Sequence, residues 1–95
     1  MATVLDDAAR DAALGELTGW AGDRSAIRRT VHVDGGPQAM DDVLAKLEVI
    51  AREMDHDPDT EITDGDLTIV MSTHSAGGVT ELDIEYARRV DALLG

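Results

Sequence analysis

Two histidines stand where a folded chain can use them for proton transfer. His56 follows a long stretch of periodic apolar residues and precedes Pro58, and His74 follows an alternating stretch and precedes Gly77-Gly78. The ends of regular elements are where a rigid scaffold usually presents reactive groups. Imidazole exchanges protons readily near neutral pH, so one histidine can accept a proton while the other donates one. The pair predicts acid–base chemistry, and the competing interpretation is a polar residue at each element end.

Other kinds of site are only weakly indicated. The third histidine, His32, shares no close motif spacing with the other two, and the chain has no cysteine to complete a zinc site. Ser72 and Ser75 lie in no nucleophile-elbow pattern, and Gly77-Gly78 lacks the flanking residues of a phosphate loop. We therefore expect no metal and no cofactor.

Periodicity and end signals predict the elements that position the two histidines. Apolar residues at helical spacing, with caps and prolines at the ends, predict three helices: Asp6–Leu17 capped by Asp6, a long helix from Pro37 to Met54, and a last helix to Leu94 that Thr80–Asp83 opens as a capping box. Alternating apolar residues predict a strand over Ala26–Val33, in which Arg29 breaks the apolar face, and a hairpin of Thr60–Thr63 and Leu67–His74 around the turn dipeptide Asp64-Gly65. Between the first helix and the first strand, Thr18–Gly22 is predicted to form a short extended piece or turn.

This order predicts one α+β domain over residues 1–95. Strands joined by hairpins and longer crossings, with helices apolar on a single face, favour an antiparallel sheet covered on one side by three helices. The other face of the sheet, or its edge, is then free to meet a second subunit.

Composition narrows the partners and the compartment. The formal net charge is −12 and there is a single lysine, which argues against a nucleic-acid partner. Arg28-Arg29 and Arg88-Arg89 are interpreted as solvated faces or subunit contacts. No apolar run approaches the length of a membrane span, and the N-terminus lacks signal-peptide regions. A chain without cysteine suits a reducing compartment, so a cytoplasmic location is expected.

Two linked motifs resemble those of the pterin-4a-carbinolamine dehydratase family. The family has Asp-His-His-Pro-Glu/Asp and then Thr-His-x-x-Gly-Gly/Leu-Ser/Thr-x-x-Asp at this separation, and the matching segments here are Asp55-His56-Asp57-Pro58-Asp59 and Ser72-Thr73-His74-Ser75-Ala76-Gly77-Gly78-Val79-Thr80-Glu81-Leu82-Asp83. Gly19-Trp20 and the strand at Ile27–Val33 also fall where the family has them, so the resemblance covers nearly the whole chain.

The resemblance implies a four-stranded antiparallel sheet with three helices on one face, in the order α-β-β-α-β-β-α, and a homodimer or homotetramer. It also implies a lyase that removes water from a 4a-hydroxytetrahydropterin (pterin-4a-carbinolamine), giving the quinonoid dihydropterin during tetrahydrobiopterin recycling. The implied catalytic residues are His56, His74 and Asp57, and the implied substrate-binding residues are Ser72, Thr73, Asp83, Thr60 and Arg52. Asp83 has a second interpretation as the acid of the capping box.

Four positions depart from the family pattern. Asp57 replaces its second histidine, Arg52 an expected glutamate, Thr60 a usual tryptophan and Leu82 a common arginine. A carboxylate at position 57 is a weak base, and it can also act on His56 through its charge. Two alternatives to a pterin dehydratase therefore stay open: an enzyme of specialised metabolism that acts on another small molecule, and a non-catalytic assembly or dimerisation module.

Overall fold

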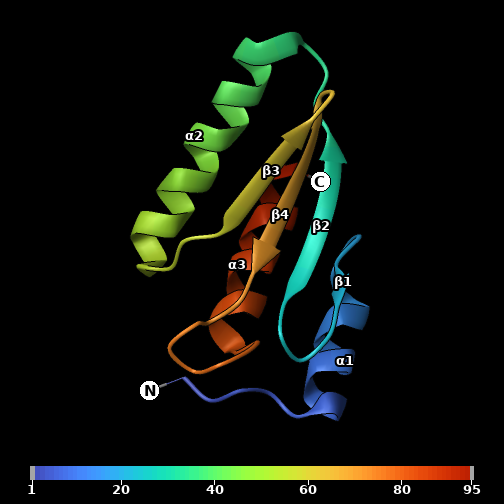
Figure 1. Cartoon of the computed structure of the whole chain (residues 1–95), viewed down its shortest axis with the longest axis vertical. Helices are drawn as coiled ribbons and strands as arrows, with labels where there is room; N and C mark the ends of the chain where they lie inside the picture. Colours follow the sequence, from blue (N-terminus) through green and yellow to red (C-terminus); the bar gives the residue numbers. More distant parts are fainter. Residues whose placement is uncertain (1, 95) are drawn as a thin grey trace.

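The computed structural model describes residues 2–94, which form three helices and a four-stranded antiparallel sheet (Figure 1). The elements are α1 (Asp7–Glu16), β1 (Ala21–Gly22), β2 (Ile27–His32), α2 (Gly36–Met54), β3 (Asp59–Thr63), β4 (Asp66–Met71) and α3 (Glu81–Leu94). The predicted α+β fold class and the predicted element order α-β-β-α-β-β-α are confirmed. Within the described residues, no helix is both long and apolar enough to cross a membrane.

The sheet has the strand order β1-β2-β4-β3, and every neighbouring pair is antiparallel. β2 and β4 form the centre, in register from Ile27 opposite Met71 to His32 opposite Asp66. The predicted hairpin between β3 and β4 is confirmed: Asp64 and Gly65 both have positive φ, 49° and 82°, as a tight two-residue turn requires.

The core lies between one face of this sheet and the helices. Leu67, Ile69 and Met71 alternate along β4 with half-buried residues and are fully buried together with Ile27 of β2. In Figure 1, α3 (red) passes behind β3 and β4, and α2 (green) runs alongside. The helices contribute most of the remaining core residues, namely Met40, Leu47, Ile50, Ala51, Ile84, Tyr86, Ala87 and Val90, and Trp20 and Val79 join the core from connections between elements.

The apolar face of β2 is interrupted by a buried ion pair. Arg29 Nη1 lies 2.6 Å from Asp91 Oδ1 of α3, and both side chains are largely buried. The same carboxylate accepts hydrogen bonds from Trp20 Nε1 and from the Thr18 amide, both at 2.7 Å. The prediction of a solvated surface is therefore wrong for Arg29, which joins β2 and the α1–β1 connection to α3, whereas Arg28 is exposed.

β4 ends at Met71, so the prediction that the strand continues to His74 is wrong. Beyond Met71, Thr73 makes an isolated bridge to Gly78, and the chain between them folds into a turn. The amides of Ala76 and Gly77 donate to the Thr73 carbonyl at 3.0 Å, which places His74 in the turn itself. The alternation survives this change, since Thr73 is buried and His74 is exposed.

Candidate active site

The end of α2 positions His56. Asp55 adopts the left-handed conformation, with φ 51° and ψ 47°, which Asp tolerates better than most residues. The His56 amide donates to the Ala51 carbonyl at 2.9 Å, and the Asp55 amide donates to the Arg52 carbonyl at 3.3 Å. This pair of bonds is a Schellman motif, and it turns the chain away from the helix so that the His56 side chain reaches the start of α3.

The start of α3 supplies the partner of that histidine. Asp83 is completely buried, and its Oδ1 lies 2.6 Å from His56 Nε2. Its Oδ2 accepts from the Thr80 amide and from Thr73 Oγ1, both at 2.9 Å. Because an ionised carboxylate only accepts, Nε2 of His56 carries the hydrogen. One carboxylate therefore closes the predicted capping box and orients the imidazole.

Buried hydroxyls saturate the network around Asp83. Thr73 Oγ1 lies 2.7 Å from Thr80 Oγ1, which also accepts from the Leu82 amide at 3.2 Å. Since Thr73 gives its proton to Asp83, the Thr80 hydroxyl must donate to Thr73. A fully satisfied buried polar network of this kind is rigid, so His56 is held in one orientation.

His56 and His74 line the same surface cleft, of about 260 Å³, at the end of the sheet where β4 leaves it. The remaining lining residues are Asp57, Asp59, Val70, Ser72, Thr73 and Ser75. The His56 side chain is 11% exposed, whereas His74 is exposed at the surface. The cleft therefore combines one oriented and largely buried imidazole with one that is exposed to solvent.

Asp57 lies between this cleft and a second hollow, of about 340 Å³. Asp57 lines both, and the second hollow is formed also by Leu44, Leu47, Glu48, Pro58 and Thr60.

Burial raises the pKa of the Tyr86 hydroxyl well above its usual range, and the negative charge of Asp57 adds to that effect. The Tyr86 hydroxyl therefore keeps its proton, which it donates to the Leu47 carbonyl at 3.0 Å, and this bond joins α3 to α2.

The structure brings together most of the predicted site residues, but two lie elsewhere. His56, His74, Asp57, Ser72 and Thr73 line the cleft, and Asp83 lies directly behind His56. Thr60 sits opposite Ile69 on the helix-covered side of the sheet and lines only the second hollow. Arg52 is exposed on α2, where it pairs with Glu48 at 3.2 Å. Neither lines the histidine cleft.

Sequence reasoning misses several residues around the cleft. Asp59 and Val70 form part of its lining and are cross-strand partners. The sequence indicates only a cap at Thr80, yet this residue completes the hydrogen-bond chain behind His56. The acidic Asp-His-Asp-Pro-Asp segment is the sequence signal that places Asp59 near His56. The pairing of Asp59 with Val70 depends on strand register, which that segment does not determine.

Two further hollows lack a pair of histidines. One of about 440 Å³ contains the single histidine His32, with Asp34 and Arg29, beside Val31, Val33, Val43 and Leu94. An apolar hollow of about 330 Å³ lies between the start of α2 and the β3–β4 turn, with Val33, Pro37, Met40 and Ile62 in its lining and Asp41 as its titratable residue. Among residues 2–94, no group of three or more His, Cys, Asp or Glu side chains is arranged to hold a metal ion.

The fold and site define a small α+β domain with paired histidines at the end of an antiparallel sheet, and comparisons identify its family. The family model described as pterin 4 alpha carbinolamine dehydratase matches residues 3–93. A Mycobacterium sp. (strain KMS) protein is 42% identical, over 99% of this chain and 98% of its own length, and a Roseiflexus sp. (strain RS-1) protein is 35% identical, over 99% and 100%. Both carry the provisional name pterin-4-alpha-carbinolamine dehydratase.

A solved structure agrees with the sequence relatives. The crystal structure described as a transcriptional coactivator/pterin dehydratase from Brucella melitensis superposes with a TM-score of 0.86 at 32% identity, over 96% of this chain and 98% of that one. The chain belongs to the pterin 4 alpha carbinolamine dehydratase family.

Proposed function

We propose that this chain removes water from a 4a-hydroxytetrahydropterin to give the quinonoid dihydropterin. In this reaction the C–O bond of the hydroxyl and an N–H bond of the ring break, a C=N bond forms, and water leaves. No electrons are exchanged with a second reactant, so the protein has to supply proton transfer and orientation. The supporting observation is the 2.6 Å contact between His56 and the buried Asp83, beside a cleft that His74 also lines.

His56 is suited to be the base. Its Nε2 hydrogen is committed to Asp83, so Nδ1 is the ring nitrogen left to accept the proton from the pterin ring. A buried carboxylate on the far side of an imidazole holds the correct tautomer and balances the positive charge that the ring gains, as in hydrolase triads. Asp83 has no other role open to it in the reaction, because it is completely buried.

His74 is suited to be the acid. It lies in the turn after β4, at the exposed side of the cleft. A protonated imidazole there can donate to the departing hydroxyl and regain its proton from water after each turnover. The two histidines thus divide the proton transfers according to their burial. We place this reaction in pterin recycling in the cytoplasm, the reducing compartment that a cysteine-free chain suits.

The test is turnover by single histidine variants. We expect His56→Ala and His74→Ala each to lower the rate of 4a-hydroxytetrahydropterin loss, above the spontaneous rate, by ~100-fold or more, the usual effect of losing a general acid or base. His32→Ala is the matched control, since His32 lies at the far end of β2 and pairs with Asp66. Unchanged rates in both cleft variants, with folding intact, would exclude histidine catalysis.

A second candidate function is the same acid–base chemistry on a different small molecule. It is favoured by the positions of Thr60 and Arg52, two of the implied substrate-binding residues, outside the cleft. Asp57→His separates the two candidates. In a pterin dehydratase the added imidazole should raise turnover several-fold, whereas in a site rebuilt for another substrate pterin turnover should stay at the spontaneous rate in both proteins.

A further inference from the structure

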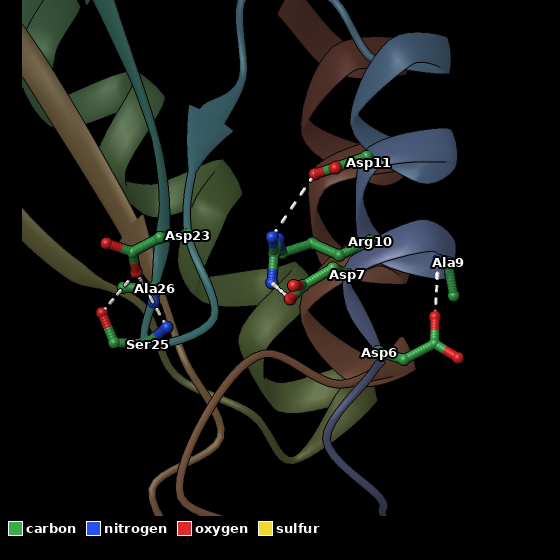
Figure 2. Close-up of polar contacts among 8 residues, drawn as sticks. All are labelled: Asp6, Asp7, Ala9, Arg10, Asp11, Asp23, Ser25 and Ala26. Carbon is green, nitrogen blue, oxygen red and sulfur yellow. Dashed lines mark hydrogen bonds and ion pairs between the residues drawn. The ribbon is translucent and has the colours of Figure 1, made fainter.

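The four-residue turn between β1 and β2 lies behind one wall of the cleft and is built around Asp23. Asp23 Oδ1 accepts from the Ser25 amide at 2.8 Å, from Ser25 Oγ at 2.5 Å and from the Ala26 amide at 3.4 Å (Figure 2). The Asp23 amide donates to the Ala26 carbonyl at 3.0 Å. This Asx-type arrangement fixes the peptide groups of Arg24 and Ser25.

Both of those peptide carbonyls contact the segment that carries the site. The Arg24 carbonyl accepts from the Val79 amide at 2.9 Å, and the Ser25 carbonyl accepts from Ser72 Oγ at 2.7 Å. The approach is so close that a Cβ on Gly78 would lie 2.6 Å from the Arg24 oxygen. The Asp23 turn is therefore joined to the strand end and turn that present Ser72 and His74.

The contact with Ser25 decides what Ser72 can offer a ligand. A serine hydroxyl has one proton and two lone pairs, and here the proton is used by the Ser25 carbonyl. Ser72 also lines the cleft, so only its lone pairs are left for a ligand. We infer that Asp23 is a positioning residue that, through Ser25, holds the Ser72 hydroxyl as a hydrogen-bond acceptor and so selects ligands that present an N–H or O–H donor to that wall.

Other residues of the cleft lining also favour ligands that donate hydrogen bonds. Asp57 and Asp59 place two more acceptor side chains on the cleft. A flat heterocycle with several N–H groups matches such a wall, and a reduced pterin, with its ring N–H groups and amino group, is one. The choice of a reduced pterin as the ligand rests on the proposed function, but the orientation of the Ser72 hydroxyl does not depend on that function. Hydrogen bonds from Ser25 lower the pKa of Asp23, so the turn stays intact throughout the neutral range.

The kinetic test compares Asp23→Ala, Asp23→Asn and Ser72→Ala. We expect Asp23→Ala and Ser72→Ala each to raise KM for the 4a-hydroxytetrahydropterin by ~5- to 10-fold, with kcat within about twofold, as for loss of one hydrogen bond that binds substrate. Asp23→Asn retains an acceptor oxygen and should restore most of the affinity. The double variant should be no worse than Ser72→Ala, because the two residues act through one contact.

Asp6→Ala is the matched control. Asp6 is also an exposed carboxylate that accepts from a backbone amide, that of Ala9 at 2.8 Å (Figure 2). It caps α1 and does not line the cleft. Its removal should leave both kinetic constants unchanged. Additive effects of Asp23→Ala and Ser72→Ala, or a KM for Asp23→Ala equal to that of Asp6→Ala, would overturn the inference.

A ligand-free measurement separates this inference from the proposed function. The NMR couplings of the Ser72 β-protons should report one rotamer in the wild type and Asp23→Asn, and averaging between rotamers in Asp23→Ala. If the wild type does not turn over pterins but these couplings change as expected, the proposed function fails and the positioning role stands. If the couplings in Asp23→Ala match the wild type, the positioning role is wrong whatever the substrate.

Discussion

At the scale of single residues, the main feature of this protein is a buried carboxylate that both caps α3 and contacts His56. Asp83 accepts three hydrogen bonds, from His56, Thr73 and the Thr80 amide, and none of its surface is exposed. Capping alone would require only the Thr80 amide. The contact with His56 is what gives the same side chain a part in the proposed proton transfer.

Substitutions at Asp83 should separate its two functions. Asp83→Ala leaves three buried donors without a partner, so we expect the free energy of unfolding to fall by about 3 kcal/mol and turnover by ~100-fold. Asp83→Asn keeps an acceptor for Thr73 and Thr80 but turns an NH₂ group toward His56. It should cost less stability yet lose as much turnover. Urea unfolding and pterin dehydration measure the two effects, and wild-type turnover in Asp83→Asn would contradict the role of the carboxylate.

His32 should give the protein a small pH-dependent increment of stability. Its Nδ1 lies 2.8 Å from Asp66 and its Nε2 lies 3.0 Å from Asp34. The hydrogen bond to Asp66, then the charge of Asp34, raise the pKa of His32 above its ordinary value of 6.5. Because the folded pKa is the higher one, this stabilisation is fully present below pH 6.5 and is lost as the pH rises through the folded pKa.

The measurement is the urea midpoint between pH ~6 and ~9, a range that brackets the histidine titration. Wild type should lose more stability over this range than His32→Gln, by a small amount because exposed pairs are screened. Identical slopes for the two proteins would show that the His32 pairs contribute nothing.

At the scale of elements, the site is assembled from element ends and turns. The end of α2 presents His56, the start of α3 presents Asp83, and the turn after β4 presents His74. The β1–β2 turn supports the last of these through Gly78, where the approach of the Arg24 carbonyl leaves no space for a side chain. The α+β scaffold itself contributes rigidity and spacing.

Two glycine substitutions should have opposite effects on stability. Gly78→Ala would place a methyl group 2.6 Å from the Arg24 oxygen, so we expect it to lower the free energy of unfolding by ~1 to 3 kcal/mol, the usual cost of overpacking, and to disturb the cleft. Gly15→Ala lies in α1 with no atom within 4 Å of the added Cβ, and should stabilise by up to ~1 kcal/mol. Thermal unfolding of both variants tests the pair, and a neutral Gly78→Ala would contradict the close approach.

At the scale of the whole molecule, the sheet leaves surfaces that a second copy could cover. Every residue of the edge strand β3 is exposed, and Ile62 on it is 52% exposed. The face away from the helices carries the half-buried Val70. Unpaired strand edges and uncovered apolar residues favour association.

We therefore expect a homodimer or homotetramer in solution. Light scattering at micromolar concentration should give a mass of at least twice the 10.1 kDa of the chain. Ile62→Lys should lower that mass if the β3 edge takes part, because a charged lysine on an edge strand opposes pairing. Ala12→Lys, at an exposed position of α1 outside the sheet, is a control for added charge alone. A monomer mass for the wild type would contradict the prediction.

The sequence by itself determined the local features of this protein. Helical and alternating periodicity predicted the order of the elements, Asp64-Gly65 the hairpin, and the Thr80–Asp83 spacing the helix cap, because these signals act between near neighbours. The motifs around His56 and His74 identified the family. The two histidines in these motifs line one cleft, and their action as a pair stays a prediction.

Tertiary structure decided which remote residues meet. Asp83 reaches His56 across 27 positions, Ser72 reaches Ser25 across 47, and Asp91 reaches Arg29 across 62. Packing of α3 against α2 and the sheet creates the first and the last of these contacts, and the pairing of β2 with β4 creates the second. No short sequence pattern encodes either. The same packing makes Arg29 a buried ion-pair partner and leaves Thr60 and Arg52 outside the histidine cleft, because strand register and helix rotation set the face on which each side chain lies.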